Sequence, residues 1–88
     1  MNNSNKKVLL SCDNLFNQLY SLESILQTTK ETCQGREFSA IYYNLKQKEK
    51  FTLSQERNNY INMLELALAR VSDIMEINNG LETEISKL

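Results

Sequence analysis

Residues 8–33 read VLLSCDNLFNQLYSLESILQTTKETC, and this stretch decides the fold. Its mainly apolar residues recur at alternating intervals of four and three: Val8, Cys12, Leu15, Leu19, Leu22, Leu26, Thr29 and Cys33. This spacing places them along one side of an α-helix, as in a coiled coil, whereas a strand would need strict alternation. We predict a helix over residues 5–34 that starts at Ser4 or Asn5 and ends at Gly35.

Two further helices are expected after Gly35. The first, over residues 36–49, would place these residues on one side: Phe38, Ile41, Tyr42 and Leu45. The second, over residues 53–78, has a seam of Tyr60, Leu64, Ala67, Val71 and Ile74. Thr52 and Gln55 match a capping box at its start. Counting this seam backwards brings Lys50 and Lys46 into it, so we expect a break near residues 50–52. The alternative is one kinked 40-residue helix that forms a plain hairpin with the first.

The fold class predicted is all-α, as a three-helix bundle or long helical hairpin in a single domain over residues 1–88. The seam continues through Asn78, Leu81, Ile85 and Leu88, but Asn79-Gly80 is typical of a helix end. Residues 80–88 are therefore expected to be frayed or to form a short C-terminal helical tail, and residues 1–4 to be frayed. Asn78 could fix the register of packing as a polar seam residue, but a helix cap is the favoured interpretation.

The expected helix lengths predict that the chain completes its core by homodimerisation. The apolar stripe is widest in the N-terminal half of the first helix, which the short second helix cannot reach. The third helix would overshoot the first, which leaves apolar surface without a partner in the chain. The candidate interface residues are Leu9, Phe16, Tyr20, Tyr43, Val71, Ile74 and Met75. Of the adjacent tyrosines, Tyr42 is expected inside and Tyr43 exposed.

Composition excludes several classes of protein. The 88 residues contain no His, no Pro and two Cys, with a net charge of −1. Without His there is no His-based triad and no His-ligated metal, and two cysteines do not make a disulfide-stapled module. No apolar run approaches the roughly 20 residues of a membrane span. We expect a cytoplasmic protein with reduced thiols, and the bias towards Asn and Lys favours an AT-rich bacterial or phage gene.

No residue pattern predicts chemistry. Cys12 and Cys33 lack the basic neighbours or further ligands that catalysis or metal binding would need, so we interpret them as small core residues. We expect no enzyme, no catalytic residue, no metal and no cofactor. The predicted function is a self-associating helical protein-protein interaction module, such as an antitoxin- or inhibitor-like accessory factor. Its partners would be a second copy, an unidentified protein, or both, with no membrane.

A basic cluster carries the alternative function. Its residues are Arg36, Lys46, Lys48 and Lys50, with Tyr42 and Tyr43 nearby. Basic residues beside aromatic ones can bind nucleic acid, and a dimer would present two such clusters at a fixed spacing. Glu37 and Glu49 lie among these cations, and the chain as a whole carries almost no net charge. Nucleic-acid binding is therefore the less favoured hypothesis.

Overall fold

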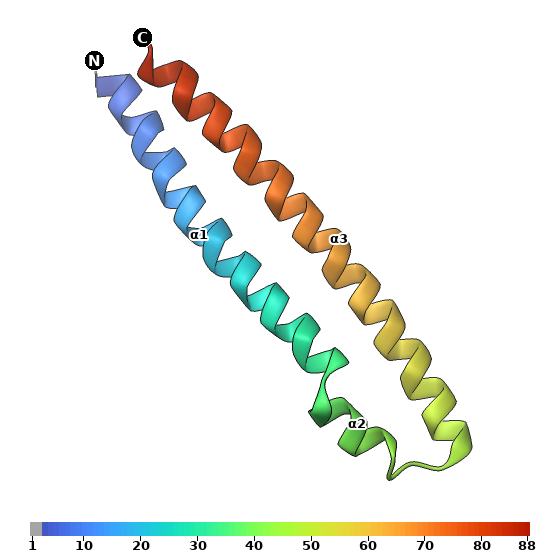
Figure 1. The fold of residues 1–88 in the computed structure, drawn as a ribbon. Helices are drawn as coiled ribbons and strands as arrows, with labels where there is room; N and C mark the ends of the chain where they lie inside the picture. Colours follow the sequence, from blue (N-terminus) through green and yellow to red (C-terminus); the bar gives the residue numbers. More distant parts are fainter. Residues whose placement is uncertain (1–2) are drawn as a thin grey trace.

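The computed structural model describes residues 3–88 as an elongated helical hairpin. The helices are α1 (Asn3–Gln34), α2 (Arg36–Tyr42) and α3 (Gln47–Ser86), and no strand occurs among the described residues. α1 and α2 follow one another along the rod, and α3 runs back beside them, so both chain ends lie at one end (Figure 1). We call this the open end and the α2 end the closed end. The rod measures 64 × 16 × 14 Å. The all-α prediction is confirmed, in the form of a hairpin.

The predicted helix end at Gly35 is confirmed. Gly35 separates α1 from α2 and has an extended backbone, with φ −100° and ψ −163°. A Cβ atom at this position would lie 3.0 Å from the carbonyl oxygen of Glu31. This is closer than most real Cβ contacts, so the tight passage from α1 into α2 favours a residue without a side chain.

The break predicted at residues 50–52 is wrong, because the chain turns earlier. α2 ends at Tyr42 instead of residue 49, and α3 is continuous from Gln47. The capping interaction also lies earlier than Thr52 and Gln55: the backbone N–H of Lys46 donates to Oε2 of Glu49 at 3.1 Å. This bond satisfies a donor just before the first turn of α3.

Aromatic rings of α2 and of Tyr43, which directly follows it, explain why cations lie in the seam without breaking α3. The Nζ atom of Lys50 lies 5.4 Å from the ring centre of Tyr42 and 6.0 Å from that of Tyr43. The guanidinium carbon of Arg57 lies 4.3 Å from the ring centre of Phe38. The faces of these rings carry negative potential and attract cations. The seam therefore holds polar residues where α2 supplies aromatic partners.

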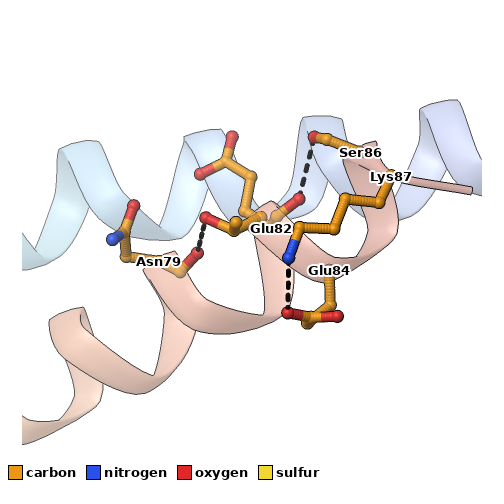
Figure 2. A network of polar contacts seen from close by, with 6 residues as sticks. Asn79, Glu82, Glu84, Ser86 and Lys87 are labelled. Carbon is orange, nitrogen blue, oxygen red and sulfur yellow. Dashed lines mark hydrogen bonds and ion pairs between the residues drawn. The ribbon is translucent and has the colours of Figure 1, made fainter.

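The predicted helix end at Asn79-Gly80 is also wrong. α3 continues to Ser86, and side chains past Gly80 bond within the same helix (Figure 2). The hydroxyls of Thr83 and Ser86 donate to the carbonyl oxygens of Asn79 and Glu82 at 2.9 and 2.8 Å, and Lys87 pairs with Glu84 at 3.1 Å. One glycine inside a helix costs about 1 kcal/mol relative to alanine, a penalty that packing against α1 can offset.

Asn78 is a buried member of the seam, so its interpretation as a helix cap is wrong. Its side chain is 6% exposed, and its Nδ2 donates to the carbonyl oxygen of Cys12 at 3.0 Å. Such a bond joins one position of α3 to one position of α1. It therefore favours one register of the hairpin over its neighbours.

The core of the hairpin is thin. The buried apolar residues are Cys12, Leu19, Ile61, Leu64 and Val71, and no described side chain is less than 2% exposed. In both helices the seam is centred on a line of residues seven apart, which runs through Cys12 and Leu19 in α1 and through Leu64 and Val71 in α3. Cys12 and Cys33 are free thiols on this line, Cys12 buried and Cys33 half-buried.

The predicted mismatch of helix lengths is wrong. α3 has 40 residues and lies beside α1 and α2, which have 32 and 7. The bond from Asn78 to Cys12 shows that the C-terminal half of α3 covers the N-terminal half of α1. The early turn after Tyr42 and the continuation past Gly80 give α3 the extra length. Any surface left for a partner must therefore come from the width of the apolar stripe.

Candidate interaction surface

The apolar stripe of each helix is wider than one partner helix can cover. Beside the central line of the seam, each helix has one line of residues on either side. In an antiparallel hairpin the corresponding lines of both helices face the same way, so the rod has two different sides. A groove of about 340 Å³ confirms this pairing at the open end, because Val8 and Leu15 of α1 line it together with Leu81 of α3.

One side of the rod is apolar along most of its length. We define the apolar side by residues at heptad spacing in α1 and α3: Val8, Leu15, Leu22, Tyr60, Ala67, Ile74 and Leu81. The six large side chains among them are each 40–50% exposed. Half-exposed apolar side chains in continuous rows, and not scattered singly, are typical of a surface that meets another protein.

The two margins of the apolar side differ in charge. The α1 margin has none: its residues are Ser4, Ser11, Gln18, Ile25 and Thr32. The α3 margin consists of Glu56, Met63, Arg70, Ile77 and Glu84. Ile25, Met63 and Ile77 are each more than 60% exposed. These side chains widen the apolar side beyond its two central rows.

The opposite side of the rod, which we call the charged side, carries ionic contacts between the helices. Lys30 of α1 pairs with Glu65 of α3 at 3.4 Å. Nearer the open end Asp13 and Glu82 face each other, and their hydrogen bond, followed by desolvation and the Asp13 charge, raises the pKa of Glu82. A groove of about 490 Å³ on this side is mostly polar and is lined by Tyr20, Glu23, Ser24, Gln27, Thr28, Glu31 and Leu68.

The molecule exposes more surface than a compact protein of its mass. Its accessible surface is 6863 Å² for a mass of 10.2 kDa. A compact monomer of this mass exposes about 5,300 Å², so the hairpin has an excess of about 1,600 Å². A standard protein-protein interface buries about 800 Å² on each partner. The excess is thus large enough for an interface of ordinary size.

The structure divides the predicted interface residues among four places. Leu9, Phe16, Tyr20 and Met75 lie towards the charged side, where the rings of Phe16 and Tyr20 stack with centres 6.5 Å apart. Ile74 belongs to the apolar side. Val71 is 5% exposed and is already covered by α1, whereas Tyr43 is 75% exposed at the closed end, beside the half-buried Tyr42.

The sequence predicts that most of the apolar side lies in the seams of the hairpin. Val8, Leu15 and Leu22 belong to the predicted first seam, and Tyr60, Ala67 and Ile74 belong to the predicted third seam. In the structure the residues of the two central lines face inwards. Beside them, Leu9 and Ile61 are more deeply buried than Val8 and Tyr60 of the apolar side. The signal in the sequence was the width of the stripe, since three neighbouring lines of mostly apolar residues exceed what one partner needs.

The basic residues are only partly brought together. Lys50 is half-buried against the tyrosine rings, whereas Arg36, Lys46 and Lys48 are exposed. Glu49 lies among them and bonds the backbone of Lys46. A pocket of about 280 Å³ beside this cluster is lined by Phe38, Ser39, Tyr42, Tyr43, Ser54 and Arg57. The closed end is thus an aromatic and cationic cluster whose cations pack on rings.

Two other kinds of site are absent from residues 3–88. Among residues 3–88 no group of three or more Cys, Asp or Glu side chains is placed to hold a metal ion. In the same range no helix is both long enough and apolar enough to cross a membrane. No protein-family model, curated protein or solved structure matches the chain.

Proposed function

We propose that the protein is a non-enzymatic helical interaction module that associates with itself. The observation that carries this proposal is the row of six half-exposed apolar side chains along one side of the rod. Burying apolar surface is the main favourable term in protein association. A hairpin with so few buried side chains gains a thicker core when a second helical surface covers this row.

The charge of the chain supports self-association. A net charge of −1 gives two copies little mutual repulsion. The charges on the rod are also unevenly placed: the Lys30–Glu65 pair lies away from the apolar side, and the α1 margin of the apolar side is uncharged. Interface cores are depleted of charged residues in the same way.

Light scattering coupled to gel filtration tests this proposal. The purified chain is expected to elute with about twice the 10.2 kDa mass of one copy at micromolar concentrations. A mass of 10.2 kDa up to 100 µM would contradict it. Since the rod is elongated, elution volume alone overestimates the mass, and the scattering signal decides.

Binding of nucleic acid is the alternative function, and its cluster lies at the start of α3. Lys46 and Lys48 are exposed there, but Lys50 packs on Tyr42 and Tyr43 and Glu49 offsets one charge. We therefore favour self-association. A salt-dependent shift of random duplex DNA that is lost in the Lys46→Ala/Lys48→Ala/Lys50→Ala variant would favour the alternative.

A further inference from the structure

We propose that a second copy covers the apolar side with the two-fold axis parallel to the rod, so that α1 of each copy packs on α3 of the other. The result is a four-helix bundle in which every helix has antiparallel neighbours. This inference rests on the proposed self-association and adds the surface and the geometry. The experiments below can contradict the geometry while the self-association stands.

The surplus of exposed surface is large enough for a second copy. The hairpin as a whole exposes about 1,600 Å² more than a compact chain of its mass, roughly twice what one partner buries in a standard interface. Homodimer interfaces are often larger and more apolar than standard ones. The apolar side also complements itself chemically, since it is apolar in both rows and its α1 margin is uncharged.

Heptad spacing arranges the apolar side in layers along the rod. From the open end these layers pair α1 with α3: Val8 with Leu81, Leu15 with Ile74, Leu22 with Ala67, and Thr29 with Tyr60. The Asn78–Cys12 bond sets this register. A two-fold axis parallel to the rod brings each layer onto the same layer of the second copy. All four layers are then buried together.

The sizes of the side chains favour α1 packing on α3 of the second copy. In this arrangement Leu22 faces Ala67 of the second copy, and Thr29 faces Tyr60 of the second copy. Each pair sets a large side chain against a small one, which fills space well in helical cores. At the margins, Ile25 faces Met63 of the second copy, two side chains that are 62% and 64% exposed in the single hairpin.

The other simple arrangement packs each helix on its own counterpart. A two-fold axis perpendicular to the rod places α1 on α1 and α3 on α3 of the second copy, and all four layers coincide when this axis passes midway between the Leu15 and Leu22 layers. The α3 margin then packs on itself, with Arg70 facing Arg70 and Glu56 facing Glu84 of the second copy. Like charges that face each other oppose association, and the parallel axis avoids these contacts.

Two neighbouring residues provide a matched test of the surface. Leu15 and Phe16 are each 41% exposed but lie on opposite sides of the rod. Leu15→Lys is expected to weaken dimerisation at least 100-fold, because the new charge would be buried in a central layer. Phe16→Lys is expected to leave the dimer mass unchanged. Circular dichroism at each concentration shows whether the Leu15→Lys chain still folds. The reverse pattern, or no difference between the two variants, would overturn the assigned side.

Disulfide cross-linking tests the direction of the axis in a chain whose apolar side is intact. The background is Cys33→Ser, since Cys12 is buried. The pair Ser11→Cys/Ile77→Cys should form a covalent dimer only with the parallel axis. The pair Ser11→Cys/Gln18→Cys should do so only with the perpendicular axis. Within one copy Ser11 and Gln18 are seven helical residues apart, about 10 Å, which is too far for a disulfide. For either pair, a disulfide within one copy leaves the mass of a single chain, so denaturing electrophoresis distinguishes it from the covalent dimer.

The outcomes separate the two proposals. A dimer mass with cross-linking of the Ser11→Cys/Ile77→Cys pair supports both. A dimer mass with cross-linking of the Ser11→Cys/Gln18→Cys pair overturns the parallel axis and leaves self-association standing. A mass of 10.2 kDa up to 100 µM overturns both proposals and leaves the apolar side to a different protein.

Discussion

Polar side chains enter the seam between α1 and α3 at both ends of the rod, and the two ends accommodate them differently. At the open end Asn78 is buried and donates to the carbonyl oxygen of Cys12 at 3.0 Å. At the closed end Arg57 and Lys50 lie over the aromatic rings of α2. A polar residue at a heptad position therefore does not end a helix when a neighbouring element supplies a partner for it.

The largest expected effect comes from reversing the polarity of the bond at the open end. Asn78→Asp replaces the donating Nδ2 by an acceptor that faces the carbonyl oxygen of Cys12. An unpaired buried charge of this kind is expected to lower the free energy of unfolding by about 3 kcal/mol at pH 7. Urea denaturation at fixed protein concentration measures the loss. It should diminish at low pH, where the new carboxyl is protonated and can donate.

Asn78→Leu is the matched control at the same position. It removes the hydrogen bond without adding a charge and places an apolar side chain in the seam. The variant is expected to unfold at the same free energy as the natural chain or a higher one, with a less sharply defined register. If Asn78→Leu were as damaging as Asn78→Asp, the loss would come from side-chain shape and not from charge.

At the closed end we expect a smaller, pairwise effect between Phe38 and Arg57. A double-mutant cycle with Phe38→Leu and Arg57→Met removes the ring and the guanidinium separately and together. The coupling free energy is expected to be about 1 kcal/mol, the size of a partly desolvated cation–π contact. Thermal unfolding of the four chains provides the values. Additive changes would mean that Arg57 and Phe38 contribute only independent packing.

Gly80 tests whether α3 is continuous at the open end. A Cβ atom at this position would meet nothing within 4 Å outside the helix backbone. Gly80→Ala is therefore expected to raise the free energy of unfolding by about 0.8 kcal/mol, because alanine restricts the unfolded chain and favours helix. Destabilisation by this substitution would instead indicate a turn at residues 79–80.

The smallest effect is expected from the carboxylate pair on the charged side. The hydrogen bond with Asp13 raises the pKa of Glu82, so the folded chain holds this proton more tightly than the unfolded chain does. The hydrogen bond between protonated Glu82 and Asp13 thus contributes fully to stability below the pKa that Glu82 has in the unfolded chain. This contribution is lost as the pH rises through the pKa of Glu82 in the folded chain. Glu82→Gln should raise the melting temperature slightly at pH 7 and leave it unchanged at pH 3. A lower melting temperature at pH 7 would contradict this account.

The two ends also show how far the sequence predicts the fold. The helix over α1 and its end at Gly35 follow from spacing and glycine alone, because both signals are local. The start of α3 does not, because Lys50 and Arg57 look like breaks in the seam until the rings of α2 are placed against them. The continuation of α3 past Gly80 likewise depends on packing against α1, and intrinsic helix propensities do not include such tertiary contacts.

The candidate surface was partly visible in the sequence. The excess width of the apolar stripe predicts exposed apolar surface, and Ile74 is the predicted interface residue that lies on the apolar side. Which of two neighbouring lines turns inwards was not predictable, because Leu15 and Phe16 are both large and apolar. Only the antiparallel register, with Asn78 against Cys12, fixes that choice.

The bond between Asn78 and Cys12 has a consequence for the order in which the chain folds. It joins residues 66 positions apart and so closes a long loop. Closing a long loop costs more entropy than closing a short one. The hairpin is therefore expected to zip from α2 towards the open end, so that amides near residues 12 and 78 gain protection last. Because the layers that begin with Val8 and Leu81 lie at that open end, docking of a second copy would complete folding where a single chain is slowest to close.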